Sequence, residues 1–355
     1  MSRTGRGVRL ISVAGLADGA ALDPLLDDEG RPVDPMLVVD LDGPAEPALL
    51  RAARDAAEVA DRILVGVRTQ GQPGGSWCDL LAALDVTLSP AWPGAPRSCV
   101  PVPAPLAQAH LLHAAATTNP QAALVLAQVL RAGAGLGVRR ALDVESFAYS
   151  TLLGGTEFRR WLAARGHRLT PPPARVPPVV VERLADHLLI TLNRPERRNA
   201  YGRELRDALV DALRVAAVDT AIGRVTLRGS GPAFCAGGDL DEFGTTPDVA
   251  TAHFVRTRAG AGELMDRIAN RVEVRLHGAC VGAGIELAAF AGHVVARAGT
   301  MVRLPEVGMG LIPGAGGTVS IPRRIGRWRT LYLALSDTRL DAVTAARWGL
   351  VDQIT

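Results

Sequence analysis

The sequence predicts a mixed α/β protein, and three observations carry that prediction. Apolar, β-prone runs alternate with runs whose apolar residues recur at three- and four-residue spacing. Two small-residue turns each join a strand-like run to a helix-like run. With 355 residues, 48% of them hydrophobic, the chain is long enough for two domains or for one large domain with a buried core.

Composition excludes several function classes. The net charge of +3 gives no indication of a nucleic-acid-binding surface. The chain contains no lysine, which excludes Schiff-base chemistry and a P-loop phosphate site. Four cysteines without metal-ligand spacing predict reduced thiols, no bound metal and a cytoplasmic location. The small-apolar run 278–302 contains Glu286, His293 and Arg297, which predicts a buried core segment and no membrane span.

The first half of the chain reads as three parts. Residues 36–68 have the pattern of a strand, a helix and a strand, and a proline- and glycine-rich stretch follows at 89–105. Residues 107–166 read as helices, over 107–116, 120–132, 145–153 and 156–165. The proline-rich segment 170–178 is typical of a semi-rigid linker at a domain boundary.

The second half begins with a predicted hairpin, 179–183 and 187–192, that turns at Ala185-Asp186. A helix follows, with Leu205, Leu209 and Leu213 on one face, and then a strand at 224–228. A helix over 252–268 and a strand over 272–276 complete the alternation. Glu273 and Arg275 share one face of that last strand and can pair with each other, face the N-terminal half or lie at a subunit contact.

The residues with the clearest chemical potential lie in the two turns and just after the second. Gly282-Ala283-Gly284 follows an apolar strand and opens an apolar helix that contains Glu286; Glu306 follows in a loop. Backbone N–H groups at such a turn can stabilise a carbonyl oxygen, and two carboxylates nearby suit acid/base chemistry on an activated carbonyl. Each feature also has a plain structural explanation. The glycines can simply form tight turns, Glu286 can offset a helix dipole, and Glu306 can pair with Arg303.

Three segments in this order resemble the crotonase (enoyl-CoA hydratase/isomerase) superfamily: 192–200, 231–240 and 280–317. The resemblance covers about residues 178–355 and implies a spiral of ββα units. It implies that the N–H groups of Gly238 and Ala283 form an oxyanion hole, that Glu286 and Glu306 are catalytic, and that Gly314 contacts the water or substrate. Arg197 and Arg198 fall in the region near coenzyme A in relatives, although a solvated surface pair is the simpler interpretation.

The implied activity is hydration of a 2-enoyl-CoA, with coenzyme A as part of the substrate and no separate cofactor. Water adds at C3, Glu286 takes its proton and Glu306 delivers a proton to C2. The alternatives are an isomerase, another acyl-CoA reaction of secondary metabolism, or a catalytically silent member that binds acyl-CoA. The family also suggests a homo-oligomer, a trimer or a dimer of trimers.

The N-terminal half changes the expected order of parts. Residues 145–165 resemble the helical tail that normally closes a crotonase chain, whereas this chain stops at Thr355, before that tail would begin. We therefore predict a helical capping segment at 107–169, placed before the core 179–355 and covering that core or a neighbour's. Residues 1–106 are either a degenerate crotonase-like half or an unrelated α/β region.

Overall fold

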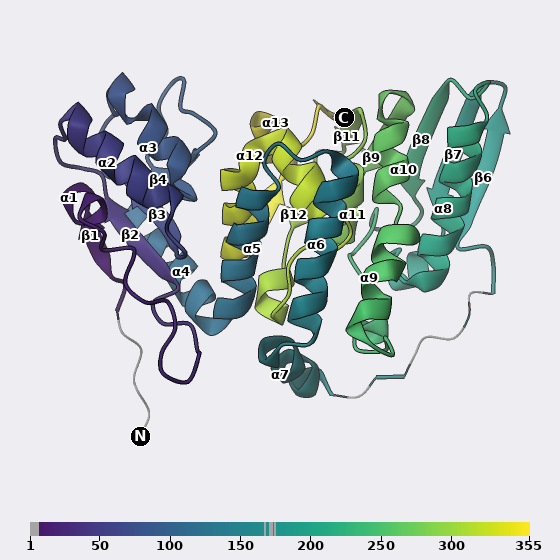
Figure 1. The fold of residues 1–355 in the computed structure, drawn as a ribbon. Coiled ribbons are helices and arrows are strands. Elements are labelled where there is room, and N and C mark those ends of the chain that lie inside the picture. Colours follow the sequence, from purple (N-terminus) through teal and green to yellow (C-terminus); the bar gives the residue numbers. More distant parts are fainter. Residues whose placement is uncertain (1–6, 167, 170–172, 174) are drawn as a thin grey trace. The chain divides into compact units, whose positions relative to one another are not determined.

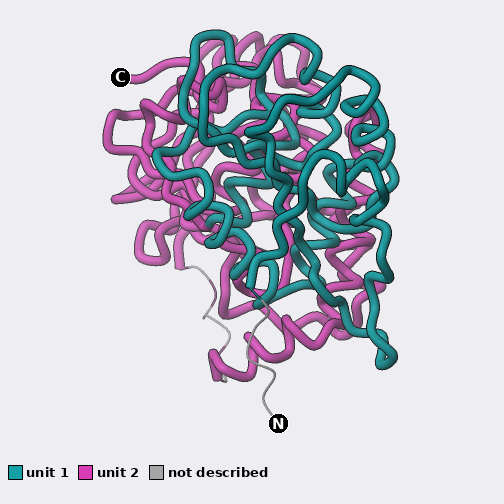
Figure 2. The backbone as a smooth tube through the Cα atoms, turned by 90° about the vertical axis from the view of Figure 1, so that its left-hand side faces the viewer, with its two compact units in different colours: residues 1–131, 326–336 teal, residues 132–325, 337–355 magenta. Residues whose placement is uncertain are grey.

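The computed structural model describes residues 7–166, 168–169, 173 and 175–355, and it divides the chain into two compact units (Figure 2). The first unit is residues 1–131 with 326–336, and the second is 132–325 with 337–355. The predicted capping segment 107–169 is therefore shared between the units. Part of the predicted linker 170–178 lies outside the described residues.

The first unit is built on a five-stranded parallel sheet whose strands follow chain order, β1 to β5 (Figure 1). The strands are β1 (Leu10–Ser12), β2 (Met36–Asp40), β3 (Ile63–Val67), β4 (Val86–Ser89) and β5 (Cys99–Pro101). The helices are α1 (Val13–Ala17), α2 (Pro47–Glu58), α3 (Cys78–Ala83), α4 (Pro105–Thr118) and α5 (Pro120–Ala132). Every residue of β3 is buried, as in parallel sheets covered on both faces. The strand–helix–strand prediction for 36–68 is confirmed.

A buried carboxylate organises the edge of this first unit. Asp85, 1% exposed, accepts the backbone N–H of Leu64 at 2.8 Å. Its other contacts are the guanidinium groups of Arg131, with Nε at 2.8 Å from Oδ1, and Arg327, at 3.2 Å. Two arginines and a backbone donor satisfy the charge that burial would otherwise penalise.

The second unit contains a six-stranded sheet in the order β14-β11-β9-β8-β7-β6 and a three-stranded sheet, β10-β12-β13. The larger sheet consists of β6 (Val179–Leu184), β7 (His187–Leu192), β8 (Arg224–Gly229), β9 (Val272–Leu276), β11 (His293–Ala296) and β14 (Gln353–Ile354). The smaller one consists of β10 (Ala279–Val281), β12 (Met301–Arg303) and β13 (Leu340–Asp341). In the larger sheet, β7, β8, β9, β11 and β14 run parallel in chain order, and β6 pairs antiparallel with β7 as the predicted hairpin.

The helices of the second unit pack around these sheets. They are α6 (Val138–Leu153), α7 (Thr156–Arg165), α8 (Arg203–Val218), α9 (Val249–Arg258), α10 (Gly262–Arg267), α11 (Ala283–Ala288) and α13 (Ala342–Trp348). Helix α12 (Gly317–Ser336) is kinked at Gly326, where the second unit gives way to the first. Within the described residues, no helix is both long enough and apolar enough to cross a membrane.

The structure decides two sequence predictions for this unit. The single helix predicted over 252–268 is wrong, because α9 ends at Arg258 and α10 begins at Gly262. A side chain at the intervening Gly260 would collide with the carbonyl oxygen of Arg256, so the chain turns there. Glu273 and Arg275 pair with each other, with Arg275 Nε 2.6 Å from Glu273 Oε1.

Helices α6 and α7 cap the core of their own chain. Figure 1 shows α6 running beside α9, and α7 contacts the 3₁₀-helix Glu306–Met309. The buried face of α6 includes Ala141, Glu145, Ser146 and Ser150, so polar side chains point into the core. This placement brings a segment from before the linker against the two turns and carboxylates of the second half.

Candidate functional site

The first small-residue turn follows β8 and is held by one buried amide. The side chain of Asn199, which is fully buried, donates to the carbonyl oxygens of Ser230 and Ala233, both at 2.9 Å, and of Phe234 at 3.1 Å. Its own Oδ1 accepts the backbone N–H of Arg194 at 2.8 Å. The sequence motif at 192–200 therefore fixes the loop that leads into the first turn.

The second turn lies directly against the first. Cys235 and Cys280 form a parallel β-bridge, and the N–H of Val281 donates to the carbonyl oxygen of Cys235 at 3.1 Å. A side chain at Gly284 would collide with that same carbonyl oxygen, so only glycine permits this approach. The two turns, 45 residues apart between the bridged cysteines (280 minus 235), form one continuous wall.

Both predicted oxyanion residues lie on this wall. Gly238 and Ala283 line the same cavity, which has a volume of about 1260 Å³. Within the described part of the chain, neither of their N–H groups donates to a protein acceptor. The cavity wall thus contains two residues whose backbone N–H groups are without a protein acceptor in the described chain.

The carboxyl groups of Glu286 and Glu306 converge beside these turns. Glu286 lies on α11 and is 2% exposed; Glu306 opens the 3₁₀-helix after β12 and is 8% exposed. Both Oε1 atoms point at the Cα of Gly282, where an added Cβ would meet Glu306 first and Glu286 at 3.6 Å. The sequence prediction that these two residues share a compartment agrees with this geometry. The Arg303 side chain pairs with Asp337, so the suggestion that Arg303 holds Glu306 is wrong.

The two carboxyl groups differ in their hydrogen bonds. Oε2 of Glu286 accepts the N–H groups of Ala315 at 2.7 Å and Gly317 at 2.9 Å. Oε2 of Glu306 is buried without a hydrogen-bond partner. Donors stabilise a carboxylate and an unpartnered oxygen does not, so Glu286 is the better anion of the pair.

Burial raises the pKa of both groups. For Glu306, burial raises the pKa to about 8. For Glu286, burial again acts first, the charges of Glu306 and Glu145 raise the pKa further, and the N–H groups of Ala315 and Gly317 oppose them. One proton shared by the pair removes the repulsion between two buried charges, and the hydrogen bonds assign that proton to Glu306.

A third buried glutamate, which the sequence analysis left without a role, comes from α6. Glu145 is 2% exposed and accepts the N–H groups of Gly316 at 2.8 Å and Thr318 at 2.9 Å, and the Thr318 hydroxyl at 2.7 Å. Burial raises its pKa to about 7, against these hydrogen bonds. The available signal was its position: Glu145 lies four residues after Ala141, on the face of α6 that is buried.

Gly314 lines the cavity, but the space that a side chain would need there is already filled. A side chain there would collide with the ring of Tyr149, another residue of α6. The guanidinium of Arg256, from α9, lies 4.5 Å from the centre of the same ring. The sequence analysis missed both residues because nothing in their local sequence distinguishes them.

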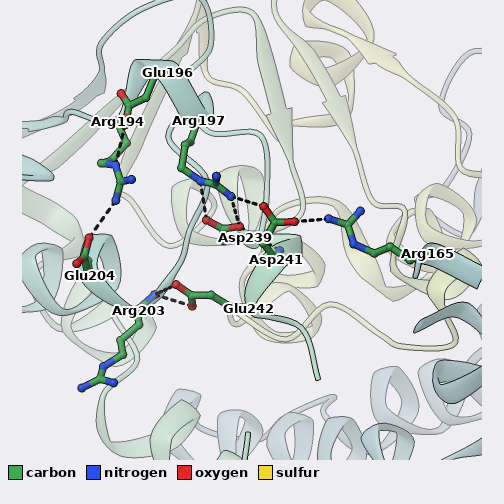
Figure 3. A network of polar contacts seen from close by, with 9 residues as sticks. All are labelled: Arg165, Arg194, Glu196, Arg197, Arg203, Glu204, Asp239, Asp241 and Glu242. Atoms are coloured by element: carbon green, nitrogen blue, oxygen red, sulfur yellow. Dashed lines mark hydrogen bonds and ion pairs between the residues drawn. The ribbon is translucent and has the colours of Figure 1, made fainter. Parts of the chain in front are cut away.

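The arginines beside the first turn have different environments. Arg197 donates to Asp239 with Nε at 2.9 Å and Nη2 at 2.6 Å, and to Asp241 at 2.9 Å (Figure 3). Arg165 of α7 reaches Asp241 from the other side at 2.6 Å (Figure 3). Arg198 is exposed and lines the cavity, whereas Arg197 is held by aspartates and is not part of the lining. The pair is therefore not a solvated surface pair. Among the described residues, no group of histidine, cysteine and acidic side chains is arranged to hold a metal ion.

Comparisons with known proteins agree on the second half of the chain. Residues 185–355 match the family model described as enoyl-CoA hydratase/isomerase. The chain is 35% identical over 176 residues to 2,3-dehydroadipyl-CoA hydratase of Escherichia coli, covering 50% of this chain and 68% of that protein. It is 33% identical over 172 residues to 1,2-epoxyphenylacetyl-CoA isomerase of the same organism, covering 47% and 65%. The chain thus spans about two thirds of the length of the curated relatives it matches.

A solved structure, an enoyl-CoA hydratase from Thermoplasma volcanium, is 33% identical, with a TM-score of 0.47, and the match covers 51% of this chain and 73% of that one. Both hydratases and isomerases appear among the relatives.

Proposed function

Because the chain belongs to the enoyl-CoA hydratase/isomerase family, we propose that it adds water across the C2=C3 double bond of a 2-enoyl-CoA thioester. One observation carries the proposal. The carboxyl groups of Glu286 and Glu306 converge in a cavity beside two backbone N–H groups that have no protein acceptor in the described chain.

The two turns would polarise the thioester. Its carbonyl oxygen would accept hydrogen bonds from the N–H groups of Gly238 and Ala283. Attack at C3 moves negative charge onto that oxygen, so donors already in place stabilise the enolate more than the ground state. Loss of one such donor typically costs about 3–4 kcal/mol of transition-state stabilisation.

The two glutamates would divide the proton transfers. Glu286, held as an anion by the N–H groups of Ala315 and Gly317, takes a proton from water while the water oxygen bonds to C3. Glu306, whose pKa is raised to about 8 by burial, carries a proton at neutral pH and delivers it to C2. The product is the 3-hydroxyacyl thioester, and the starting state is restored when Glu286 loses its proton and Glu306 regains one, directly or by way of solvent.

Coenzyme A would enter as part of the substrate. The sequence predicts two arginines near coenzyme A. Arg197 is bound to Asp239 and Asp241, so Arg198, which lines the cavity, would bind the phosphates. In this proposal the helices α6 and α7 roof the acyl group in cis.

The test is Glu306→Gln. We expect it to lower the hydration rate of crotonyl-CoA, followed as loss of absorbance of the conjugated double bond, by about 10²–10⁴-fold. Binding of the saturated butyryl-CoA, measured by calorimetry, should stay close to that of the wild type. Glu182→Gln is the control, because Glu182 is exposed on β6. Near-native turnover by Glu306→Gln would refute the assignment.

Double-bond migration is the second candidate, and the isomerases among the relatives favour it. Migration needs one group that removes a proton and returns it at another carbon, and Glu306, with its unpartnered oxygen, could do so alone. Analysis of the product of a 3-enoyl-CoA separates the two reactions: a 2-enoyl-CoA that accumulates without a 3-hydroxyacyl product indicates an isomerase.

A further inference from the structure

Arg256 lies on the wall of the cavity with polar contacts on only part of its guanidinium. Nε donates to the hydroxyl of Ser146 at 3.2 Å, and Nη2 donates to the carbonyl oxygen of Ser146 at 3.2 Å and to the hydroxyl of Ser150. These contacts hold the side chain of Arg256, on α9, against α6. Nη1 donates no hydrogen bond within the described part of the chain.

No carboxylate of the described residues lies within ion-pair distance of Arg256. This distinguishes it from other arginines of the unit: Arg165 and Arg197 pair with Asp241, and Arg303 pairs with Asp337. Glu145, from the neighbouring helix, has its oxygens bound to Gly316 and Thr318. Burial lowers the pKa of Arg256, and the charge of Glu145 opposes this shift without forming an ion pair.

Tyr149 links Arg256 to the paired glutamates. Its ring lies 4.5 Å from the guanidinium carbon of Arg256 and against Gly314. Tyr149 lines the same cavity as Glu286 and Glu306. Arg256 of α9 and Tyr149 of α6 therefore both line the cavity, and each has a donor group for which no hydrogen bond to a described residue is present.

We propose that Arg256 and Tyr149 bind a carboxylate carried by the acyl chain, so that the preferred substrates are monothioesters of unsaturated dicarboxylic acids. This proposal rests on the proposed function and specifies its substrate class. The planar guanidinium matches a carboxylate, and the phenol hydroxyl adds a second donor. The bound carboxylate would form the direct ion pair that no carboxylate of the described residues forms with Arg256. It would also hold the distal end of the acyl chain so that C2 and C3 lie between the glutamates.

The test compares matched pairs of thioesters that differ only at the acyl terminus. Each pair is a methyl-ended 2-enoyl-CoA and its ω-carboxylate counterpart, from four-carbon to six-carbon chains. We expect the wild-type protein to prefer the carboxylate member of at least one pair by about 10- to 100-fold in kcat/KM, the effect of a hydrogen bond to a charged group. Arg256→Met should bring that ratio close to unity. Arg258→Met is the matched control, because Arg258 lies on the same helix, exposed and outside the cavity.

Three results overturn the proposal. A wild-type protein without preference in any pair contradicts it, whatever the variants do. An Arg256→Met protein that keeps the wild-type ratio assigns the recognition to other residues. Equal loss on both members of every pair assigns Arg256 to coenzyme A or to the fold.

Binding separates this proposal from the proposed function. Adipyl-CoA and hexanoyl-CoA are saturated, so their affinities do not depend on hydration. If the protein hydrates neither type of thioester but binds adipyl-CoA at least about tenfold more tightly, the hydratase assignment fails and the carboxylate site stands. If it hydrates crotonyl-CoA but binds the two saturated thioesters equally, the carboxylate site fails and the hydratase assignment stands.

Discussion

A methyl group added at Gly317 tests whether the backbone at the start of α12 positions Glu286, the proposed catalytic base. The Cβ of Gly317→Ala would lie 2.6 Å from Cγ and 2.8 Å from Oε2 of Glu286. Real Cβ atoms essentially never approach closer than 3.0 Å, so the Glu286 side chain must move by at least ~0.4 Å, which is 3.0 minus 2.6. The backbone of Gly317 is helical and does not require glycine, so the strain falls on Glu286 and on Pro313, whose Cβ would lie 2.8 Å from the added methyl.

The effect on catalysis should exceed the effect on stability. A misplacement of about 1 Å in an active site can cost about 10²-fold, so we expect kcat for crotonyl-CoA to fall about tenfold, or ~1.4 kcal/mol. Alanine favours a helix over glycine by about 1 kcal/mol, which offsets part of the repacking cost, so the melting temperature should change little. Gly299→Ala is the control, since no atom lies within 4 Å of the added methyl. Native turnover in Gly317→Ala would show that Glu286 need not be held in this position.

Three further substitutions test other parts of the structure. Asp85→Asn leaves Arg131 without its buried counter-ion and should lower the free energy of urea unfolding by about 3 kcal/mol. In Glu145→Gln, one of the two carboxylate oxygens is replaced by an NH₂ group, so the N–H of Gly316 or of Thr318 loses its acceptor. The free energy of unfolding should fall by about 2 kcal/mol, and hydrogen exchange at the start of α12 should be faster. Glu306 has a pKa raised from 4.5 to about 8, so the native state holds a proton that the unfolded chain releases. Its stabilising contribution is complete below pH 4.5 and is lost as the pH rises through about 8. Glu306→Gln should therefore gain stability relative to the wild type between pH 5 and pH 9, on the order of 4 kcal/mol, measured by urea unfolding; no pH dependence of this difference would contradict the assigned protonation.

The core of the candidate site was predictable because its signals are local. The turns are marked by glycines that follow apolar strands, and Glu286 is a charge in a helix that is otherwise apolar. The glycines also have a physical reason, since Gly284 approaches the carbonyl oxygen of Cys235 and Gly282 has a φ of +47°. Such constraints act within a few residues of the chain, so a sequence reveals them.

The rest of the site was not predictable because it depends on distant contacts. Glu145 meets Gly316 across 171 positions, and Ser146 meets Arg256 across 110. Helical periodicity predicts that Glu145 and Ser146 lie on a buried face, but it does not show which residues they contact. The break between α9 and α10 was missed for a similar reason. The apolar spacing typical of a helix continues through Gly260, but the helical backbone ends at Arg258 and begins again at Gly262.

The placement of α6 before the core has a consequence for the chemistry. Four consecutive N–H groups at the start of α12 alternate between two carboxylates: Ala315 and Gly317 donate to Glu286, and Gly316 and Thr318 donate to Glu145. The unpaired donors and the positive end of a long helix are thus shared by a residue of the core and a residue of the preceding segment. After burial and the charge of Glu306, the charge of Glu145 also raises the pKa of Glu286. One turn therefore attaches the cap through Glu145 and positions the proposed base through Glu286, so α6 is part of the candidate site and not only its cover.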